Sequence, residues 1–102
     1  MENPSQQNKI QAPPLKASEE KIHVMVRNRI KILFDDDVKS LTSKNDSGIF
    51  DILPEHSNFI TLINSPLILR KPDGQKQEIS FISGLLIVKD DSVHCYVDLL
   101  PK

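Results

Sequence analysis

Apolar and other side chains alternate along the first patterned stretch of the chain. Ile22, Val24 and Val26 stand at every second position, which is the period of a strand with one buried face. Asn28 and Arg29 then separate this stretch from a second apolar run over residues 30–34. A short polar connection between two such runs predicts that they form a β-hairpin.

Short apolar runs continue along the chain, and residues that favour turns separate them. Lys71-Pro72-Asp73-Gly74 predicts a turn, because proline fixes one backbone dihedral and glycine accepts a positive φ. Asp90, Asp91 and Ser92 are expected to join the last two strands. The further strands are expected over residues 38–43, 48–53, 59–63, 67–70, 77–83, 85–89 and 93–97.

No window of the sequence keeps a helical period. Turn signals recur about every 8–12 residues, which is typical of β-sandwiches and barrels. The sequence therefore predicts an all-β fold, a β-sandwich of about ten short strands. Residues 1–20 are polar and hold few apolar side chains, so a disordered tail is expected before a sandwich domain over residues 21–102. A recruitment peptide within this tail stays open as an alternative.

Composition narrows the class of protein. A length of 102 residues fits one domain, and the 13 basic residues nearly balance the 14 acidic ones. This balance gives no overall attraction to nucleic acid or to an anionic membrane. No apolar run approaches the roughly 20 residues that span a bilayer, and no signal-peptide pattern is present. The single cysteine, Cys95, leaves no intrachain disulfide. We therefore expect a cytosolic protein or a soluble part of a larger assembly.

Candidate catalytic and metal-binding residues are few. His94 and Cys95 are neighbours in an expected strand, so they point to opposite faces and cannot act together as base and nucleophile. The acidic run Asp35–Asp37 lacks the ligand spacing and the glycine of a calcium loop. His23, His56 and His94 are too far apart for a zinc motif, and the sequence has no phosphate-binding loop. Hence no catalytic residue, cofactor or metal is expected, and a small hydrolase or metal-dependent enzyme is the least favoured class.

The stretch GIFDILPEHSNFITLI, residues 48–63, resembles the most recognisable motif of one family. This family is the N-terminal β-sandwich domain of the epsilon subunit of rotary ATP synthases, with the pattern G-x-[FL]-G-[IV]-[LY]-P-x-H-[AS]-P-[LF]-[LIV]-[TA]-x-[LI]. The similarity continues in the alternation of residues 22–26 and in the run ISGLLIV at residues 82–88, so it covers about residues 21–98. The motif positions that fit are Gly48, Phe50, Ile52, Leu53, Pro54, His56, Ser57, Phe59, Ile60, Thr61 and Ile63.

The chain departs from the family pattern in its turns and in one contact position. Asp51 replaces the second glycine of the motif, Asn58 replaces the proline after the histidine, and Gly84 stands alone where members have two glycines. Ile49 stands where many members carry an acidic residue, so Asp46 or Asp51 is expected to take over that polar contact. The sequence ends before the two-helix hairpin of typical members, so the helical inhibitory switch is expected to be lacking.

The resemblance implies a non-catalytic subunit of the central stalk, which couples the membrane c ring to the gamma subunit during ion-driven ATP synthesis. Such a subunit is peripheral at the cytoplasmic face of the inner or plasma membrane and reaches the membrane only through the ATP synthase complex. The alternative is a free-standing β-sandwich interaction module, because a fold does not fix a function. The implied contacts with the c ring or gamma are Asp46, Ser47, Gly48, Ile49, Phe50 and His56, and the implied structural turn residues are Pro54 and Gly84.

The role of His56 stays open between three possibilities. No other candidate ligand lies near it in sequence, which disfavours a metal site. A pH switch would use the titration of imidazole near neutrality. We favour a hydrogen bond that orders the loop after Pro54, because imidazole can donate and accept at once, and a partner contact from the same ring is compatible with it. Phe50, Leu53 and Phe59 are expected in the core rather than at an interface.

Overall fold

The computed structural model describes residues 20–99, which form eight strands and no helix. Accordingly, no helix in this range is long and apolar enough to cross a membrane. The predicted all-β class is confirmed, whereas the tail expected over residues 1–20 lies outside the described range except for Glu20. The strands are β2 (Ile22–Arg27), β3 (Ile32–Val38), β4 (Ser40–Asn45), β5 (Gly48–Ile52), β6 (Phe59–Arg70), β7 (Lys76–Ile79), β8 (Gly84–Lys89) and β9 (Ser92–Val97).

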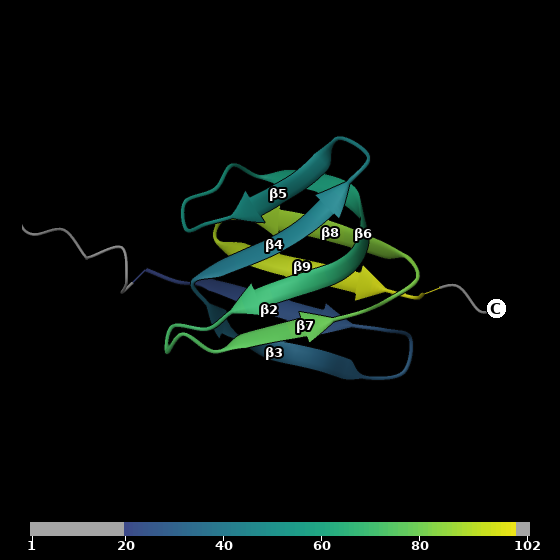
Figure 1. The fold of residues 1–102 in the computed structure, drawn as a ribbon, viewed down its shortest axis with the longest axis horizontal. Helices are drawn as coiled ribbons and strands as arrows, with labels where there is room; N and C mark the ends of the chain where they lie inside the picture. Colours follow the sequence, from purple (N-terminus) through teal and green to yellow (C-terminus); the bar gives the residue numbers. More distant parts are fainter. Residues whose placement is uncertain (1–19, 100–102) are drawn as a thin grey trace, which may run out of the picture.

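The strands form two layers that share β6. In the large sheet the order is β3-β2-β9-β8, followed by the first half of β6, and all pairs are antiparallel except β2 with β9. In the small sheet the second half of β6 pairs with β4 and β7, and β4 pairs with β5. Figure 1 shows the layers with β4 and β5 in front of β8 and β9. The predicted hairpin of residues 22–34 is confirmed as the β2–β3 pair.

One long strand replaces two of the short strands that the sequence predicts. Residues 59–63 and 67–70 belong to the single 12-residue strand β6, which passes from the large sheet to the small one. The buried Ser43 of β4 supports this crossing, because its hydroxyl lies 3.3 Å from the Asn64 carbonyl and 3.2 Å from the Pro66 carbonyl. The structure therefore has eight strands over residues 20–99, fewer than the ten or so that the sequence predicts.

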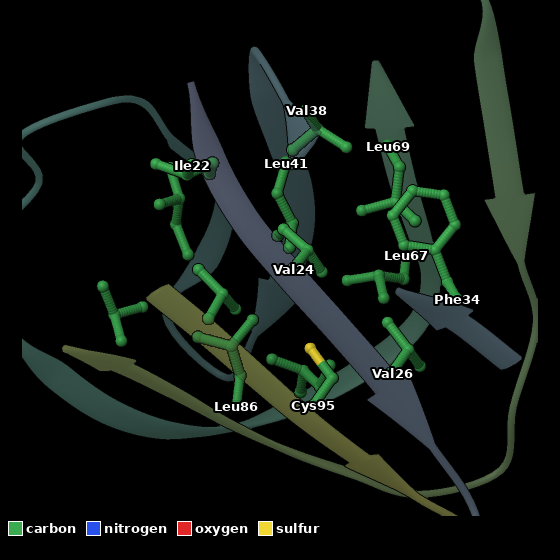
Figure 2. Packing of buried hydrophobic residues seen from close by; sticks show 14 of the residues in the cluster. Ile22, Val24, Val26, Phe34, Val38, Leu41, Leu67, Leu69, Leu86 and Cys95 are labelled. Atoms are coloured by element: carbon green, nitrogen blue, oxygen red, sulfur yellow. The ribbon is translucent and has the colours of Figure 1, made fainter. Parts of the chain in front are cut away.

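The core lies between the two sheets and is built by alternating side chains. In β2, Ile22, Val24 and Val26 are buried, whereas His23 is exposed. Figure 2 shows side chains from both layers meeting, among them Leu86 from the large sheet. Each buried aliphatic side chain stabilises the fold by about 1.5–3 kcal/mol. The remaining buried apolar residues are Phe34, Val38, Leu41, Ile52, Ile63, Leu67, Leu69, Phe81, Val88, Val93, Cys95 and Val97.

The turns agree with the sequence except at Gly84. Asp90 and Asp91 both have positive φ in the β8–β9 turn, and Gly74 has φ of 95° in the β6–β7 turn. Gly84, expected as a turn residue, instead begins β8. A Cβ atom there would lie 2.8 Å from Cγ1 of Ile63, so the close approach of β6 requires glycine at this position.

Candidate partner-binding surface

The β4–β5 hairpin has a short and well-fixed tip. Asn45 pairs with Gly48, so Asp46 and Ser47 alone form the loop, and both are exposed. Gly48 has φ of 127°, which side chains with a Cβ rarely adopt. The Asn45 side chain accepts a hydrogen bond from the Ser47 amide at 2.8 Å and donates one to Oγ1 of Thr61 at 3.1 Å. The tip is therefore held against β6.

The loop after β5 begins with the turn that Pro54 was expected to form. The Leu53 carbonyl accepts a hydrogen bond from the His56 amide at 3.2 Å, and Glu55 has φ of 67°. Proline at the second position and a positive φ at the third are the features of a type II turn. The Glu55 amide also donates to Oδ1 of Asp91 at 2.6 Å, so this turn is tied to the distant β8–β9 turn.

His56 orders this loop, as favoured from the sequence. Its Nδ1 lies 2.8 Å from the Ser57 carbonyl, to which it donates. Its ring packs on Phe59 with centroids 5.1 Å apart, and Phe59 meets Phe50 edge to face at 6.0 Å. These rings connect the loop, β5 and β6. Phe50 and Phe59 pack against the core as predicted, but the core prediction is wrong for Leu53, which is 54% exposed because it follows the end of β5.

The outer surface of the large sheet is apolar where β6 and β8 meet. Ile60 and Leu62 of β6 are 67% and 73% exposed. They stand directly opposite Ile87 and Leu85 of β8. We call these four side chains the apolar face. An antiparallel sheet normally presents polar residues to water, and a contiguous apolar patch marks a surface that binds another molecule.

The hairpin tip and the apolar face form one continuous surface. A shallow hollow of about 250 Å³ is lined by Asp46 and Ser47 at the tip and by Leu62 of the apolar face, together with Asn45 and Thr61. The structure thus brings two residues of the implied contact set beside an apolar side chain that the sequence analysis did not single out as a site.

Ile49 lies on the outer surface of the small sheet, where it is 79% exposed. It lines a second hollow of about 150 Å³ together with Pro66, Ile68 and residues 42–44. Asp51, on the same surface, accepts a short hydrogen bond from the Thr42 hydroxyl. Asp46 stands exposed at the tip, so it is the better placed of the two carboxylates for a polar contact with a partner.

The structure does not bring His94 and Cys95 together as a base and a nucleophile. Cys95 is buried, and burial raises the pKa of its thiol to about 12, so the thiolate is absent at neutral pH. His94 lies exposed on the opposite face of β9, with its ring edge-on to Tyr96. Among the described residues, no group of three or more histidine, cysteine or acidic side chains is placed to hold a metal ion. The structure instead pairs His23 with Asp35 and Asp37.

The apolar face was missed in the sequence, although a signal was present. Residues 59–63 and 84–88 are apolar at nearly every position rather than at every second one. A strand of that composition is covered on both faces, and here the small sheet covers the inner face alone. Reading the unbroken runs in this way would have indicated an apolar outer face on the sheet.

The comparisons with known proteins agree with this architecture. Residues 21–99 match the sequence family described as the delta/epsilon chain β-sandwich domain of ATP synthase. The chain belongs to this family. The epsilon chain of Sulfurovum sp. strain NBC37-1 is 34% identical over 68 residues, which cover 66% of this chain and 53% of that protein. The epsilon chain of Leptospira borgpetersenii serovar Hardjo-bovis is 30% identical over 78 residues, covering 76% of this chain and 61% of that protein.

Solved structures show the same fold. A chain of the Euglena gracilis mitochondrial ATP synthase, solved as OSCP, F1 and c ring, superposes with a TM-score of 0.72 at 15% identity, covering 95% of this chain and 59% of its own length. A chain of the Tetrahymena thermophila central stalk and c ring gives a TM-score of 0.64 at 19% identity, covering 76% of this chain and 63% of its own. This delta/epsilon domain spans about half the length of the first epsilon chain it matches.

Proposed function

We propose that this chain is an epsilon-type, non-catalytic subunit of the central stalk of a rotary ATP synthase. It couples the c ring to the gamma subunit during ion-driven ATP synthesis. The observation that carries this proposal is the family match over residues 21–99, which takes in every described strand. The subunit sits at the cytoplasmic face of the inner or plasma membrane as a peripheral part of the complex.

We assign the two parts of the continuous surface to different partners. The apolar face fits gamma, because desolvated apolar anchors dominate the free energy of protein interfaces. The hairpin tip, Asp46 to Gly48, with the adjoining Ile49, fits the polar loops of the c ring, as the family resemblance implies. The rings of Phe50 and His56 both pack on Phe59. They therefore support the position of the hairpin tip and contribute only indirectly to the contact with the c ring or gamma.

Co-purification tests this proposal with a matched pair of variants. Ile60→Asp places a charge in the apolar face, whereas Ile30→Asp makes the same change at an isoleucine that is 79% exposed in the β2–β3 connection. We expect tagged wild-type chain to capture gamma and the c ring. We expect Ile60→Asp to lose at least about tenfold of the captured gamma, because burying an unpaired charge is costly, and Ile30→Asp to keep it.

Two outcomes would argue against this assignment. Equal capture by Ile60→Asp and the wild type would remove the apolar face from the gamma contact. Failure of the wild-type chain to capture either partner under gentle conditions would refute the stalk function and favour a free-standing interaction module.

A further inference from the structure

His23 lies on the outer side of β2 between two carboxylates of β3. Its Nδ1 is 2.9 Å from Oδ1 of Asp37, and its Nε2 is 2.6 Å from Oδ1 of Asp35. The strand register explains the arrangement, because Asp37 pairs with His23 and Asp35 pairs with Met25, the next residue on the same face. One imidazole ring thus bridges two positions of the neighbouring strand.

This geometry requires the charged form of the ring. An ionised carboxylate only accepts hydrogen bonds, so each ring nitrogen of His23 must donate. Both nitrogens carry a hydrogen only in the imidazolium form. In agreement, the hydrogen bonds that the ring donates to Asp37 and then to Asp35 raise the pKa of His23 above its usual 6.5, against a smaller opposing effect of desolvation.

The other groups that face His23 do not duplicate these bonds. On β9, its register partner is the uncharged Ser92, and the next outward side chain is His94. The backbone amide of His23 donates to the carbonyl of Asp91 in the β8–β9 turn. Lys21, just before β2, stands two residues ahead of His23 in the sequence. Among the described contacts, Asp35 and Asp37 are therefore the charges that hold the ring.

The bridged strand is the one most open to separation from the large sheet. Among the described strands, β3 stands at the end of the sheet order and pairs with β2. Its inner side contributes Phe34 and Val38 to the core. An opening of β3 would expose these two side chains, so any bond that fastens β3 to β2 from the outer side protects the core.

We propose that His23, Asp35 and Asp37 form a pH-sensitive clasp that fastens the edge strand β3 when the imidazole is protonated and releases it when the proton is lost. The clasp is independent of the proposed stalk function. Because folding raises the pKa of His23, its stabilisation is fully present below 6.5 and is lost as pH rises through the raised value.

Hydrogen exchange of the β3 amides tests the clasp on the full chain. Between about pH 5.5 and about pH 8.5, where imidazole titrates, protection relative to intrinsic exchange is expected to fall about two- to fivefold in β3. The amides of β9 are expected to keep their protection over the same range. His23→Gln should abolish the pH dependence in β3. Asp36→Asn is the matched control, because Asp36 lies between the two carboxylates but bonds the Asp37 amide instead of His23.

Titration of the His23 ring by NMR gives a second measurement. The midpoint is expected to fall in the double variant Asp35→Asn/Asp37→Asn and to stay unchanged in Asp36→Asn. Equal midpoints in the wild type and the double variant would overturn the proposal. So would a pH dependence of β3 protection that persists in His23→Gln.

Discussion

At the scale of single residues, Asn58 shows how a departure from the family pattern acquires a role of its own. The family has proline at this position, but here the Asn58 side chain accepts a hydrogen bond from the Asp90 amide at 2.9 Å. Together with the bond from the Glu55 amide to Asp91, it ties the loop after β5 to the β8–β9 turn. Both bonds join residues more than thirty positions apart, so the local pattern gave no sign of them.

We predict that Asn58→Ala destabilises the domain by about 0.5–1.5 kcal/mol, the usual net value of one hydrogen bond. The Asp90 amide loses its side-chain acceptor, and the loop after β5 loses one of its two hydrogen bonds to the β8–β9 turn. Urea unfolding measures the change in the free energy of unfolding. Ser57→Ala is the control, because Ser57 is exposed and its carbonyl, which accepts from His56, is kept. Equal losses in both variants would contradict the role of Asn58.

At the scale of elements, the sequence predicted most strands but not the continuity of β6. Pro66 and the polar Asn64 and Ser65 interrupt the apolar pattern, so residues 59–63 and 67–70 were expected as two strands. The chain in fact continues through this segment, because a strand that changes sheets needs no apolar side chain at the crossing. The crossing is held by a hydrogen bond from Ser43, which is 21 residues away from Asn64. No local signal in the sequence indicates this pairing.

We predict that Ser43→Ala weakens the crossing at a cost of about 1–3 kcal/mol. Ser43 is 3% exposed, and without its hydroxyl the carbonyls of Asn64 and Pro66 lose their donor in a place that water reaches poorly. Urea unfolding gives the total, and hydrogen exchange should show the largest loss of protection in β4 and β6. Ser40→Ala, in the same strand but half-buried, is expected to cost much less. A uniform loss of protection over all strands would contradict a local role for Ser43.

At the scale of the whole molecule, the sequence predicted the two layers better than it predicted the exposed apolar surface of the large sheet. Alternation in β2 and β9 separates inner from outer side chains, and the structure confirms it. The sequence did not predict the apolar face, because both sides of β6 and β8 carry apolar residues and periodicity cannot tell the inner side from the outer side. The hairpin tip was predicted through the family motif, while the hollow that it lines together with Leu62 depends on how β4 and β6 pack.

The buried thiol of Cys95 reports on the stability of the whole core, because its protonation depends on folding. Burial raises its pKa from 9.0 to about 12, so the unfolded chain releases this proton near pH 9 and the folded chain holds it. The free energy of unfolding should therefore fall as pH rises through this interval, by at most about 1.4 kcal/mol per pH unit. Cys95→Ala should lack that part of the slope, although its overall stability is also lower because of lost packing.

A thiol-specific reagent at about pH 8 provides the direct measurement, because only the thiolate reacts. We expect Cys95 to be labelled in folded protein only through the small population of globally opened molecules, since its strand β9 lies between β8 and β2, and at once in urea. The Asn58→Ala variant should be labelled faster, by about tenfold for each 1.4 kcal/mol lost from the free energy of unfolding. Rapid labelling of the wild type in native buffer would mean that the sandwich opens locally at β9, contrary to a core that behaves as one cooperative unit.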